Sequence, residues 1–184
     1  MNYTVIGGKK LSGSVRTNTS KNAAVALLAA SLLNRGTTTL KRMPRIEEVK
    51  RLVEVLESIG VTVEWPDNGL PAQAGDMTIT PGVVDLSRIN AESATRTRAI
   101  ALFAPPLAHL LGSFELPAPT GCDLGKRSLG AHVDALARLG IHLEGDEEKH
   151  VYRVEVKNLH AEEIIMFEAS DTGTENVLMA AARI

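Results

Sequence analysis

One segment of the chain resembles another, and this internal repeat limits the folds that the sequence can adopt. Residues 56–64, Leu-Glu-Ser-Ile-Gly-Val-Thr-Val-Glu, align with residues 136–144, Leu-Ala-Arg-Leu-Gly-Ile-His-Leu-Glu, at a separation of 80 positions. Gly36 and Gly112 each follow an Ala- and Leu-rich stretch and lie 76 positions apart. The difference of four predicts a short insertion in the second copy, in the loop around Cys122. Repeats of this size indicate units that share one core.

Both copies show the same order of predicted elements, with helices read from apolar spacing and strands from β-branched runs. The first copy has a helix at 21–34, a strand at 37–40, a helix at 45–59 and strands at 61–65 and 77–80. The second has a helix at 94–111 interrupted by Pro105 and Pro106, a strand at 113–116, a helix at 128–139 and strands at 141–144 and 151–156. A third copy begins near residue 173. We therefore predict an α/β (α+β) fold of two helix-strand-helix-strand-strand units and a partial third, after a β-hairpin of residues 3–6 and 11–15.

The amino-acid composition limits the kinds of molecule that this chain is expected to bind and the compartment in which it is expected to occur. With 184 residues, 44% of them hydrophobic, the chain can bury a sizeable core. The formal net charge of −2 and the dispersed Lys and Arg residues argue against a nucleic-acid partner. A single cysteine excludes an internal disulfide framework and a metal site of several cysteines. The first residues lack a secretory signal pattern and no apolar run is long enough to span a bilayer, so we expect a cytoplasmic protein without a membrane partner.

The only cysteine, Cys122, lies in a predicted loop with glycines on both sides, Gly121 and Gly125. Lys126 and Arg127 follow it at the predicted start of a helix, where free backbone N–H groups also favour anions. A thiol beside cations can be acidic or nucleophilic. A spare surface cysteine would fit the same pattern.

Superimposing the three units brings polar residues to one point, the first turn of each unit's buried helix. They are Lys21 with Asn22, Arg98, and Glu175 with Asn176. Helix N-termini that open onto the same cavity can together bind an anion. With the arginine of the cysteine loop, Lys21 and Arg98 predict a basic cluster for phosphate or carboxylate groups. Exposed helix caps and surface ion pairs would give the same spacing.

In combination, four motifs of this sequence resemble the UDP-N-acetylglucosamine 1-carboxyvinyltransferases, enolpyruvyl transferases of peptidoglycan synthesis and thus of cell wall biogenesis. The motifs are Ser20-Lys-Asn-Ala-Ala, Thr97-Arg-Ala, Pro119-Thr-Gly-Cys-Asp-Leu-Gly-Lys-Arg with His132, and Ser170-Asp-Thr-Gly-Thr-Glu-Asn. The resemblance implies an inverse α/β barrel of two domains, each built from three units, of which this chain is the N-terminal half. It assigns residues 17–184 to the first domain, with an incomplete third unit, and the strands in residues 1–16 to the second domain.

The resemblance also implies a reaction, the transfer of the enolpyruvyl group from phosphoenolpyruvate to the 3′-hydroxyl of UDP-N-acetylglucosamine. Cys122 matches the acid that protonates the methylene carbon, and as a nucleophile it would react with epoxides such as fosfomycin. Lys21 and Arg127 match residues that hold the phosphate and carboxylate of phosphoenolpyruvate. No cofactor and no metal are implied.

A second group of residues matches the family's contacts to the UDP-sugar. Asn22 and Arg98 match direct contacts, and Ser170, Thr172 and Gly173 lie where the family binds the diphosphate or the uridine. These roles come from the resemblance and add to the predicted anion site.

Two residues depart from the family pattern. Gly130 stands where the family commonly has an aspartate that approaches the uracil, and Asp171 puts a negative charge at the expected diphosphate site. We expect weaker nucleotide binding by like-charge repulsion, and we expect the chain to be inactive alone, because further catalytic groups belong to the other half. We also expect self-association or a C-terminal partner chain that covers the open third unit.

Two alternatives stay open. One is an enolpyruvyl transferase with another acceptor, such as shikimate 3-phosphate, against which the cysteine loop argues. The other is a non-catalytic ligand-binding or interaction protein derived from the same fold.

Overall fold

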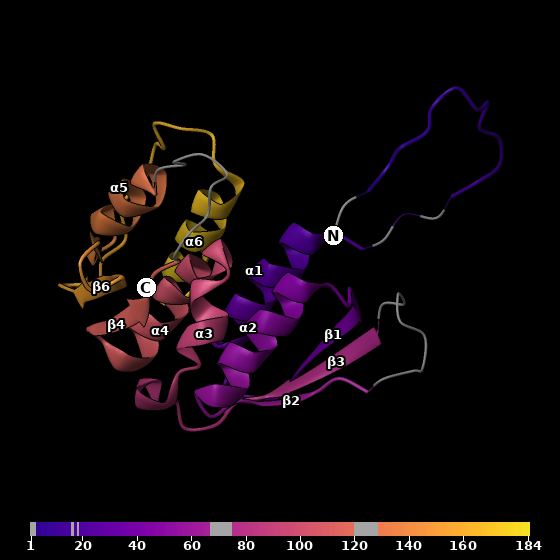
Figure 1. Ribbon diagram of the computed structural model, residues 1–184. Helices are drawn as coiled ribbons and strands as arrows, with labels where there is room; N and C mark the ends of the chain where they lie inside the picture. Colours follow the sequence, from indigo (N-terminus) through magenta and orange to yellow (C-terminus); the bar gives the residue numbers. More distant parts are fainter. Residues whose placement is uncertain (1–2, 16, 18, 67–74, 120–128) are drawn as a thin grey trace.

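The computed structural model describes residues 3–15, 17, 19–66, 75–119 and 129–184, and its elements repeat in two units. The elements of unit one are α1 (Lys21–Ser31), β1 (Thr38–Met43), α2 (Glu47–Ser58), β2 (Thr62–Glu64) and β3 (Gly75–Thr80). Those of unit two are η1 (Leu86–Arg88), α3 (Ala91–Thr95), η2 (Arg98–Phe103), α4 (Ala104–Leu111), β4 (Phe114–Pro117), α5 (Gly130–Arg138), β5 (Ile141–Asp146) and β6 (Val151–Val156). The last helix, α6 (Asp171–Ala181), follows as the start of a third unit (Figure 1).

The two sheets have the same topology, which confirms the predicted α/β fold of repeated units. Each is an antiparallel three-stranded sheet whose last strand lies in the middle, in the orders β1-β3-β2 and β4-β6-β5. The registers correspond as well, since Val63 lies opposite Ile79 in the first sheet and Leu143 opposite Val154 in the second. The sequence repeat is therefore a structural repeat.

The predicted helix at 94–111 is divided into three pieces, α3, η2 and α4. The break comes at Thr97, whose backbone is extended (φ −133°, ψ 134°) and whose side chain caps η2. Pro105 and Pro106 lie in the first turn of α4, where backbone N–H groups have no acceptor within the helix. The N–H groups that these prolines lack therefore cost no helical hydrogen bond. The prolines therefore help to start a helix rather than interrupting one.

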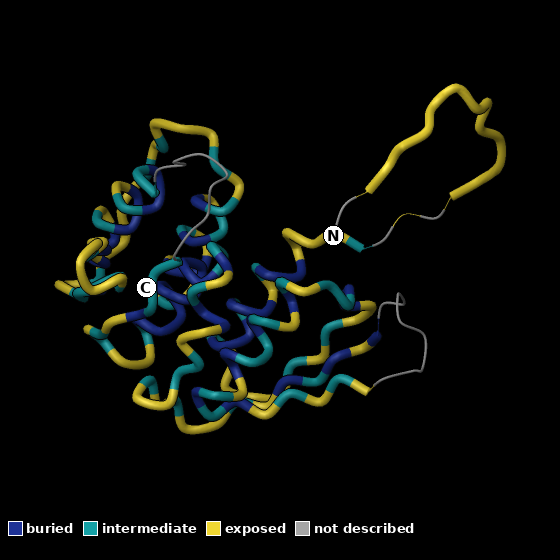
Figure 2. Tube along the Cα trace, in the orientation of Figure 1, coloured by how far each residue is buried: buried dark blue, intermediate teal, exposed yellow. Residues whose placement is uncertain are grey.

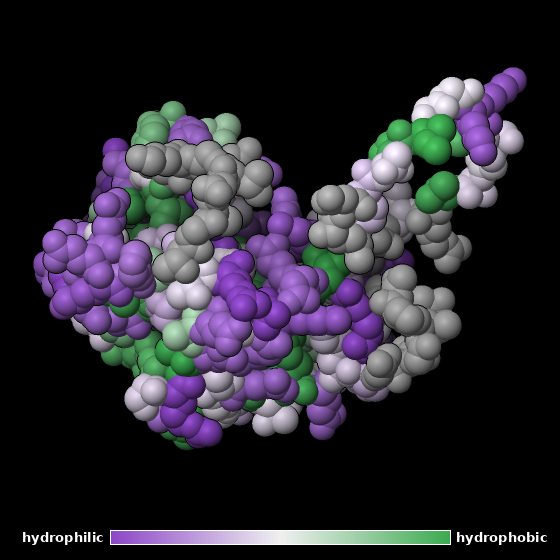
Figure 3. All heavy atoms as spheres, viewed as in Figure 1, coloured by the Kyte–Doolittle hydropathy of each residue, from purple (hydrophilic) through white to green (hydrophobic). Residues whose placement is uncertain are grey.

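The predicted hairpin at the N-terminus is wrong, because no strand forms among the described residues before α1. The apolar residues of this segment are 82–93% exposed. Figure 1 shows it as a loop that projects from the rest of the protein, and Figure 3 shows hydrophobic residues on its surface. An isolated two-stranded hairpin is marginally stable in water, so β-prone residues alone do not hold one together.

The core lies where the helices of the two units meet. Leu28 of α1, Leu52 of α2, Phe103 of η2 and Leu107 of α4 are all fully buried, and each such side chain stabilises the fold by about 1.5–3 kcal/mol. Figure 2 shows these helices dark blue on their inner faces. Among the described residues, none of the helices has the length and apolar character needed to cross a lipid bilayer.

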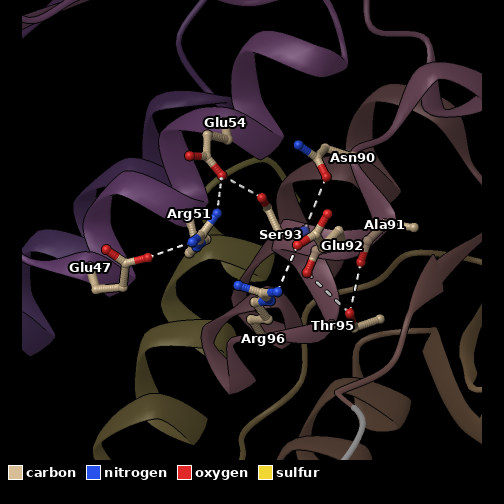
Figure 4. A network of polar contacts seen from close by, with 9 residues as sticks. All are labelled: Glu47, Arg51, Glu54, Asn90, Ala91, Glu92, Ser93, Thr95 and Arg96. Atoms are coloured by element: carbon tan, nitrogen blue, oxygen red, sulfur yellow. Dashed lines mark hydrogen bonds and ion pairs between the residues drawn. The ribbon is translucent and has the colours of Figure 1, made fainter. Parts of the chain in front are cut away.

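A polar network joins α2 of unit one to α3 of unit two (Figure 4). The carboxylate of Glu54 accepts hydrogen bonds from the Ser93 hydroxyl and from Arg51, the latter at 3.0 Å. Arg51 also pairs with Glu47 at 2.6 Å, within α2. On the other helix, Asn90 caps α3 by accepting from the Ser93 N–H at 3.0 Å. The network fixes the position of α3 and hence of η2, which begins three residues later.

Candidate functional site

Three helices begin at the rim of a single cavity of about 560 Å³. Ser20 caps α1, its hydroxyl accepting from the Ala23 N–H at 3.2 Å. Thr97 caps η2 by accepting from the Ala99 N–H at 3.1 Å, and Ser170 caps α6 in the same way. Residues at the starts of α1, η2 and α6 all line this cavity, so the three helix N-termini lie close together on one side of the protein. Figure 1 shows α5 and α6 beside each other at this end.

Five of the residues predicted from the sequence line this cavity: Lys21, Asn22, Arg98, Ser170 and Thr172. They come from all three units: the superposition of the repeats predicts Lys21, Asn22 and Arg98, whereas Ser170 and Thr172 of the third unit come from the family resemblance. Their roles toward a ligand stay predictions.

Two other predicted residues, Gly173 and Asn176, lie behind the cavity wall. Gly173 is buried, and its N–H donates to the Ser170 hydroxyl at 3.1 Å. A Cβ at Gly173 would lie 2.7 Å from the Met166 methyl carbon and 3.0 Å from the Ser170 hydroxyl oxygen, so a side chain there would require these two side chains to shift. The prediction that Glu175 and Asn176 lie in the first turn is wrong, because α6 begins four residues earlier, at Asp171, after a serine cap.

Cys122 and Arg127 lie outside the described residues, as does Lys126. Gly130, the first residue of α5, is described and half-buried. The predicted roles of Cys122 and Arg127 therefore stay predictions.

Glu48 lines one side of the cavity, and it was not predicted from the sequence as a site residue. Its carboxylate forms an ion pair with Lys21 and accepts a hydrogen bond from the Thr97 hydroxyl at 2.8 Å. It thus connects the starts of α1 and η2 through α2. In the sequence, Glu48 is one polar residue on the solvent side of an amphipathic helix, and no local signal distinguishes it from its neighbours.

The charges that line the cavity are mixed. Lys21 and Arg98 are the two cations of the described lining, against the carboxylates of Glu48, Glu168 and Asp171. The predicted basic cluster is therefore not basic overall in the part that the structure describes. An anion bound here would depend on hydrogen-bond donors as well as on net charge.

His132 of α5 forms the inner wall and is almost completely buried. Its Nε2 atom lies 3.1 Å from the Thr172 hydroxyl, and its Nδ1 atom lies 2.9 Å from the side-chain amide nitrogen of Asn176. Burial lowers the pKa of His132, and the nearby Arg98 lowers it further, whereas Glu168 opposes them. The imidazole is therefore neutral at physiological pH.

Among the described residues, no group of three or more His, Cys, Asp or Glu side chains is arranged to hold a metal ion. The chemistry of the described lining is that of an anion or polar-ligand site, with ammonium, guanidinium, amide and hydroxyl donors around one cavity.

Comparisons with known proteins place the chain in a family. Residues 5–184 match the sequence model of EPSP synthase (3-phosphoshikimate 1-carboxyvinyltransferase). The UDP-N-acetylglucosamine 1-carboxyvinyltransferase of Thermobifida fusca is 36% identical over 183 residues, and that of Treponema denticola is 34% identical over 180 residues. The matches cover 98% of this chain but 42% and 40% of those relatives, so the chain spans less than half of their length.

Solved structures show the same fold. The enolpyruvyl transferase NikO from Streptomyces tendae superimposes with a TM-score of 0.76 at 20% identity, over 96% of this chain and 40% of that one. An EPSP synthase from Acinetobacter baumannii gives a TM-score of 0.64 at 18% identity, over 91% of this chain and 37% of that one. These similarities confirm the predicted fold class.

Proposed function

Since this chain belongs to the EPSP synthase (3-phosphoshikimate 1-carboxyvinyltransferase) family, we propose that its cavity takes part in moving an enolpyruvyl group from phosphoenolpyruvate to the 3′-hydroxyl of UDP-N-acetylglucosamine. The acceptor is inferred from the relatives at 34–36% identity, which carry that sugar nucleotide in their name. The reaction would serve peptidoglycan synthesis in the cytoplasm, where a lone thiol stays reduced.

One observation carries the proposal: residues from three separate units, matched to the family by motif, line one cavity. Lys21 supplies a point charge for a phosphate group, and Arg98 can pair with two oxygens of a diphosphate at once. Asn22 and Ser170 add neutral donors for the sugar nucleotide. In the bound state, the ligand would compete with Glu48 for the Lys21 ammonium group.

The cysteine loop would supply the chemical step. The Cys122 thiol would protonate the methylene carbon of phosphoenolpyruvate while Arg127 and Lys21 hold its anionic groups. We expect no turnover by the 184-residue chain alone, because groups that act as one unit in catalysis fail together when part is missing.

Titration calorimetry with UDP-N-acetylglucosamine tests the binding half of the proposal. Arg98→Ala should weaken binding at least tenfold, because a charged hydrogen-bonded contact contributes roughly 1.5–3 kcal/mol. Arg96→Ala is the matched control, since Arg96 lies two residues away, is exposed and pairs with Glu92 at 2.7 Å. Equal affinities for the two variants would remove Arg98 from the site, and no binding by the wild-type chain would contradict the proposal for this chain.

Intact mass measured after incubation with fosfomycin tests the role of Cys122. We expect a single adduct on Cys122 that forms faster when UDP-N-acetylglucosamine is present, and none in Cys122→Ser. An adduct formed at the same rate with and without the sugar nucleotide would mean that the loop and the nucleotide site are not connected.

We also propose that residues 1–16 belong to a second domain and that the surface around α6 is covered by another chain or by self-association. Leu178 of α6 is 64% exposed, and Leu27 of α1 is 48% exposed. A partner that covers these two leucines would remove exposed apolar surface from water. Light scattering should therefore show a species larger than the 19.7 kDa monomer, and a clean monomer would contradict this part.

A further inference from the structure

Asn176 is completely buried in α6, and its orientation is set by a backbone carbonyl. Its side-chain nitrogen donates to the carbonyl oxygen of Ala101 in η2 at 3.2 Å. A carbonyl oxygen only accepts hydrogen bonds, so the amide must direct its NH₂ group there. The opposite orientation would place two acceptor oxygens against each other in the core.

The same NH₂ group fixes the protons of His132. Because the Asn176 nitrogen lies 2.9 Å from Nδ1 and can only donate, Nδ1 must be the unprotonated, accepting nitrogen of the ring. A neutral imidazole carries one proton, so that proton is on Nε2. A protonated ring would set an N–H at Nδ1 against the amide N–H.

The proton on Nε2 then fixes the direction of the next hydrogen bond. Nε2 lies 3.1 Å from the Thr172 hydroxyl oxygen, so the ring donates and that oxygen accepts. The hydroxyl hydrogen of Thr172 is thereby left to donate away from the ring. Thr172 is half-buried and lines the cavity.

We propose that the Ala101 carbonyl orients the Asn176 amide, that this amide donates to His132 and His132 donates to Thr172, and that the Thr172 hydroxyl is thereby set as a donor toward the cavity; we call this arrangement the Asn176–His132 relay. Asn176 and His132 are positioning residues, and Thr172 selects a ligand oxygen that can only accept, such as a diphosphate oxygen. The inference rests on the proposed function for the identity of that ligand. It also gives this site a neutral donor next to Asp171, where a second positive charge would otherwise be needed.

The charges around His132 agree with a neutral ring. Arg98 approaches from η2 and disfavours a second positive charge, and Glu168 approaches from the segment before α6 and favours one. Burial adds to the effect of Arg98, so the pKa of the ring lies below its ordinary value.

Imidazole ¹⁵N–¹H spectra of the 184-residue chain test the relay directly. His132 should show a protonated Nε2 and an unprotonated Nδ1 at pH 7, whereas exposed His142 and His150 should exchange between tautomers. Asn176→Asp replaces the donor by an acceptor and should move the His132 proton to Nδ1 or raise its pKa. A wild-type ring that is protonated on Nδ1, or charged, at pH 7 would overturn the relay.

Calorimetry with two probes, UDP-N-acetylglucosamine and uridine, tests what Thr172 selects. Thr172→Val should weaken the binding of UDP-N-acetylglucosamine about tenfold, because one hydrogen bond to a charged group is lost. Thr172→Ser should bind this probe as tightly as wild type. Uridine, which lacks the diphosphate, should bind Thr172→Val and wild type alike. Thr95→Val is the matched control, because Thr95 is also half-buried but does not line the cavity.

Equal binding of the sugar nucleotide by wild type and Thr172→Val would overturn the selection role. If the wild-type chain does not bind the sugar nucleotide at all, the proposed function fails for this chain, and the imidazole spectra still decide the relay.

Discussion

Gly60 and Gly140 occupy the same place in the two units, and replacing either by Ala should destabilise the protein strongly. Both follow a helix C-cap with a left-handed backbone, at φ +102° and +86°. A Cβ at Gly60 would lie 2.5 Å from the carbonyl oxygen of Val83, and one at Gly140 would lie 2.8 Å from that of Asn158 and closer still to that of Lys157. The segment that leaves the last strand of each unit passes directly over this glycine.

Two costs add for these variants. A left-handed conformation costs a residue with a Cβ about 1–2 kcal/mol. Overlap with a backbone carbonyl that cannot rotate away adds about 1–3 kcal/mol, as in overpacked cores. The sum of about 2–5 kcal/mol is a large part of a stability of roughly 5–15 kcal/mol, and at about 2–4 °C per kcal/mol the middle of that range lowers Tm by about 10 °C.

Gly112→Ala separates the two costs. Gly112 also has a positive φ, +76°, but a Cβ there would meet no atom of the described residues within 4 Å. It should therefore show the backbone cost alone, which at its φ of 76° and ψ of −118°, a conformation that glycine favours, is about 1–3 kcal/mol. Gly36→Ala, where an added Cβ would have only Asn34 Oδ1 at 3.8 Å and φ is not positive, should change little.

Urea unfolding followed by circular dichroism, with thermal melts of the same four variants, measures these differences. We expect Gly140→Ala and Gly60→Ala to be similar to each other and clearly less stable than Gly112→Ala. If all three lost the same free energy, the close approach of the following segment would not constrain these positions, and the reasoning from the repeat would be refuted.

Three further substitutions test the polar network between α2 and α3, the partly buried carboxylate of Glu175 in α6, and the hydrophobic core. Glu54→Gln should lower the free energy of unfolding by about 1 kcal/mol at pH 7, because the Ser93 hydrogen bond that lowers the pKa of Glu54 then reaches a neutral acceptor. A lowered folded-state pKa gives stability that is present above the unfolded pKa of about 4.5 and is lost as pH falls through the folded-state pKa, so in urea titrations the difference from wild type should shrink below about pH 4.5 and vanish once Glu54 is protonated in the folded protein. Glu175→Gln should instead raise stability at pH 7, by at most about 1 kcal/mol because solvent screens the charge in part. Burial, and then Asp171, raise the pKa of Glu175, and one of its oxygens is buried with no hydrogen-bond partner among the described residues. That gain should disappear near pH 4, where the carboxyl is protonated in both states, and a gain that persists there would contradict it. Leu52→Ala should cost about 2–5 kcal/mol in urea unfolding at an unchanged m-value, because the side chain is fully buried.

The elements that could be predicted from the sequence are those whose signals are local. The apolar spacing of residues 45–59 gives α2 within two residues at its start and one at its end, and β6 is observed at the predicted residues 151–156. Gly60 and Gly140 mark the helix ends because only glycine adopts this backbone easily. The agreement of two separate units then makes the topology of the sheets predictable.

What could not be predicted depends on contacts between distant residues. The N-terminal segment has the composition of two strands, but pairing needs a hydrophobic face to pack on. Glu48 becomes part of the site only because the fold brings Lys21 and Thr97 to it from other elements. Asn176 carries an amide side chain of a kind that often contacts ligands. Its place in the second turn of α6 directs it instead to Ala101 and His132 in the core.

The charge balance of the cavity explains why these buried residues bear on function. Three carboxylates and two cations among the described lining residues leave an anion with little net electrostatic attraction. We therefore expect binding to depend, besides Lys21 and Arg98, on groups whose dipoles are fixed before the ligand arrives, which here are the starts of α1, η2 and α6 and, in the proposed relay, the hydroxyl of Thr172. A fixed dipole needs a rigid support, and the Asn176–His132 pair supplies one from the core. In the proposed relay, residues that never touch the ligand thus help to determine which ligand is accepted.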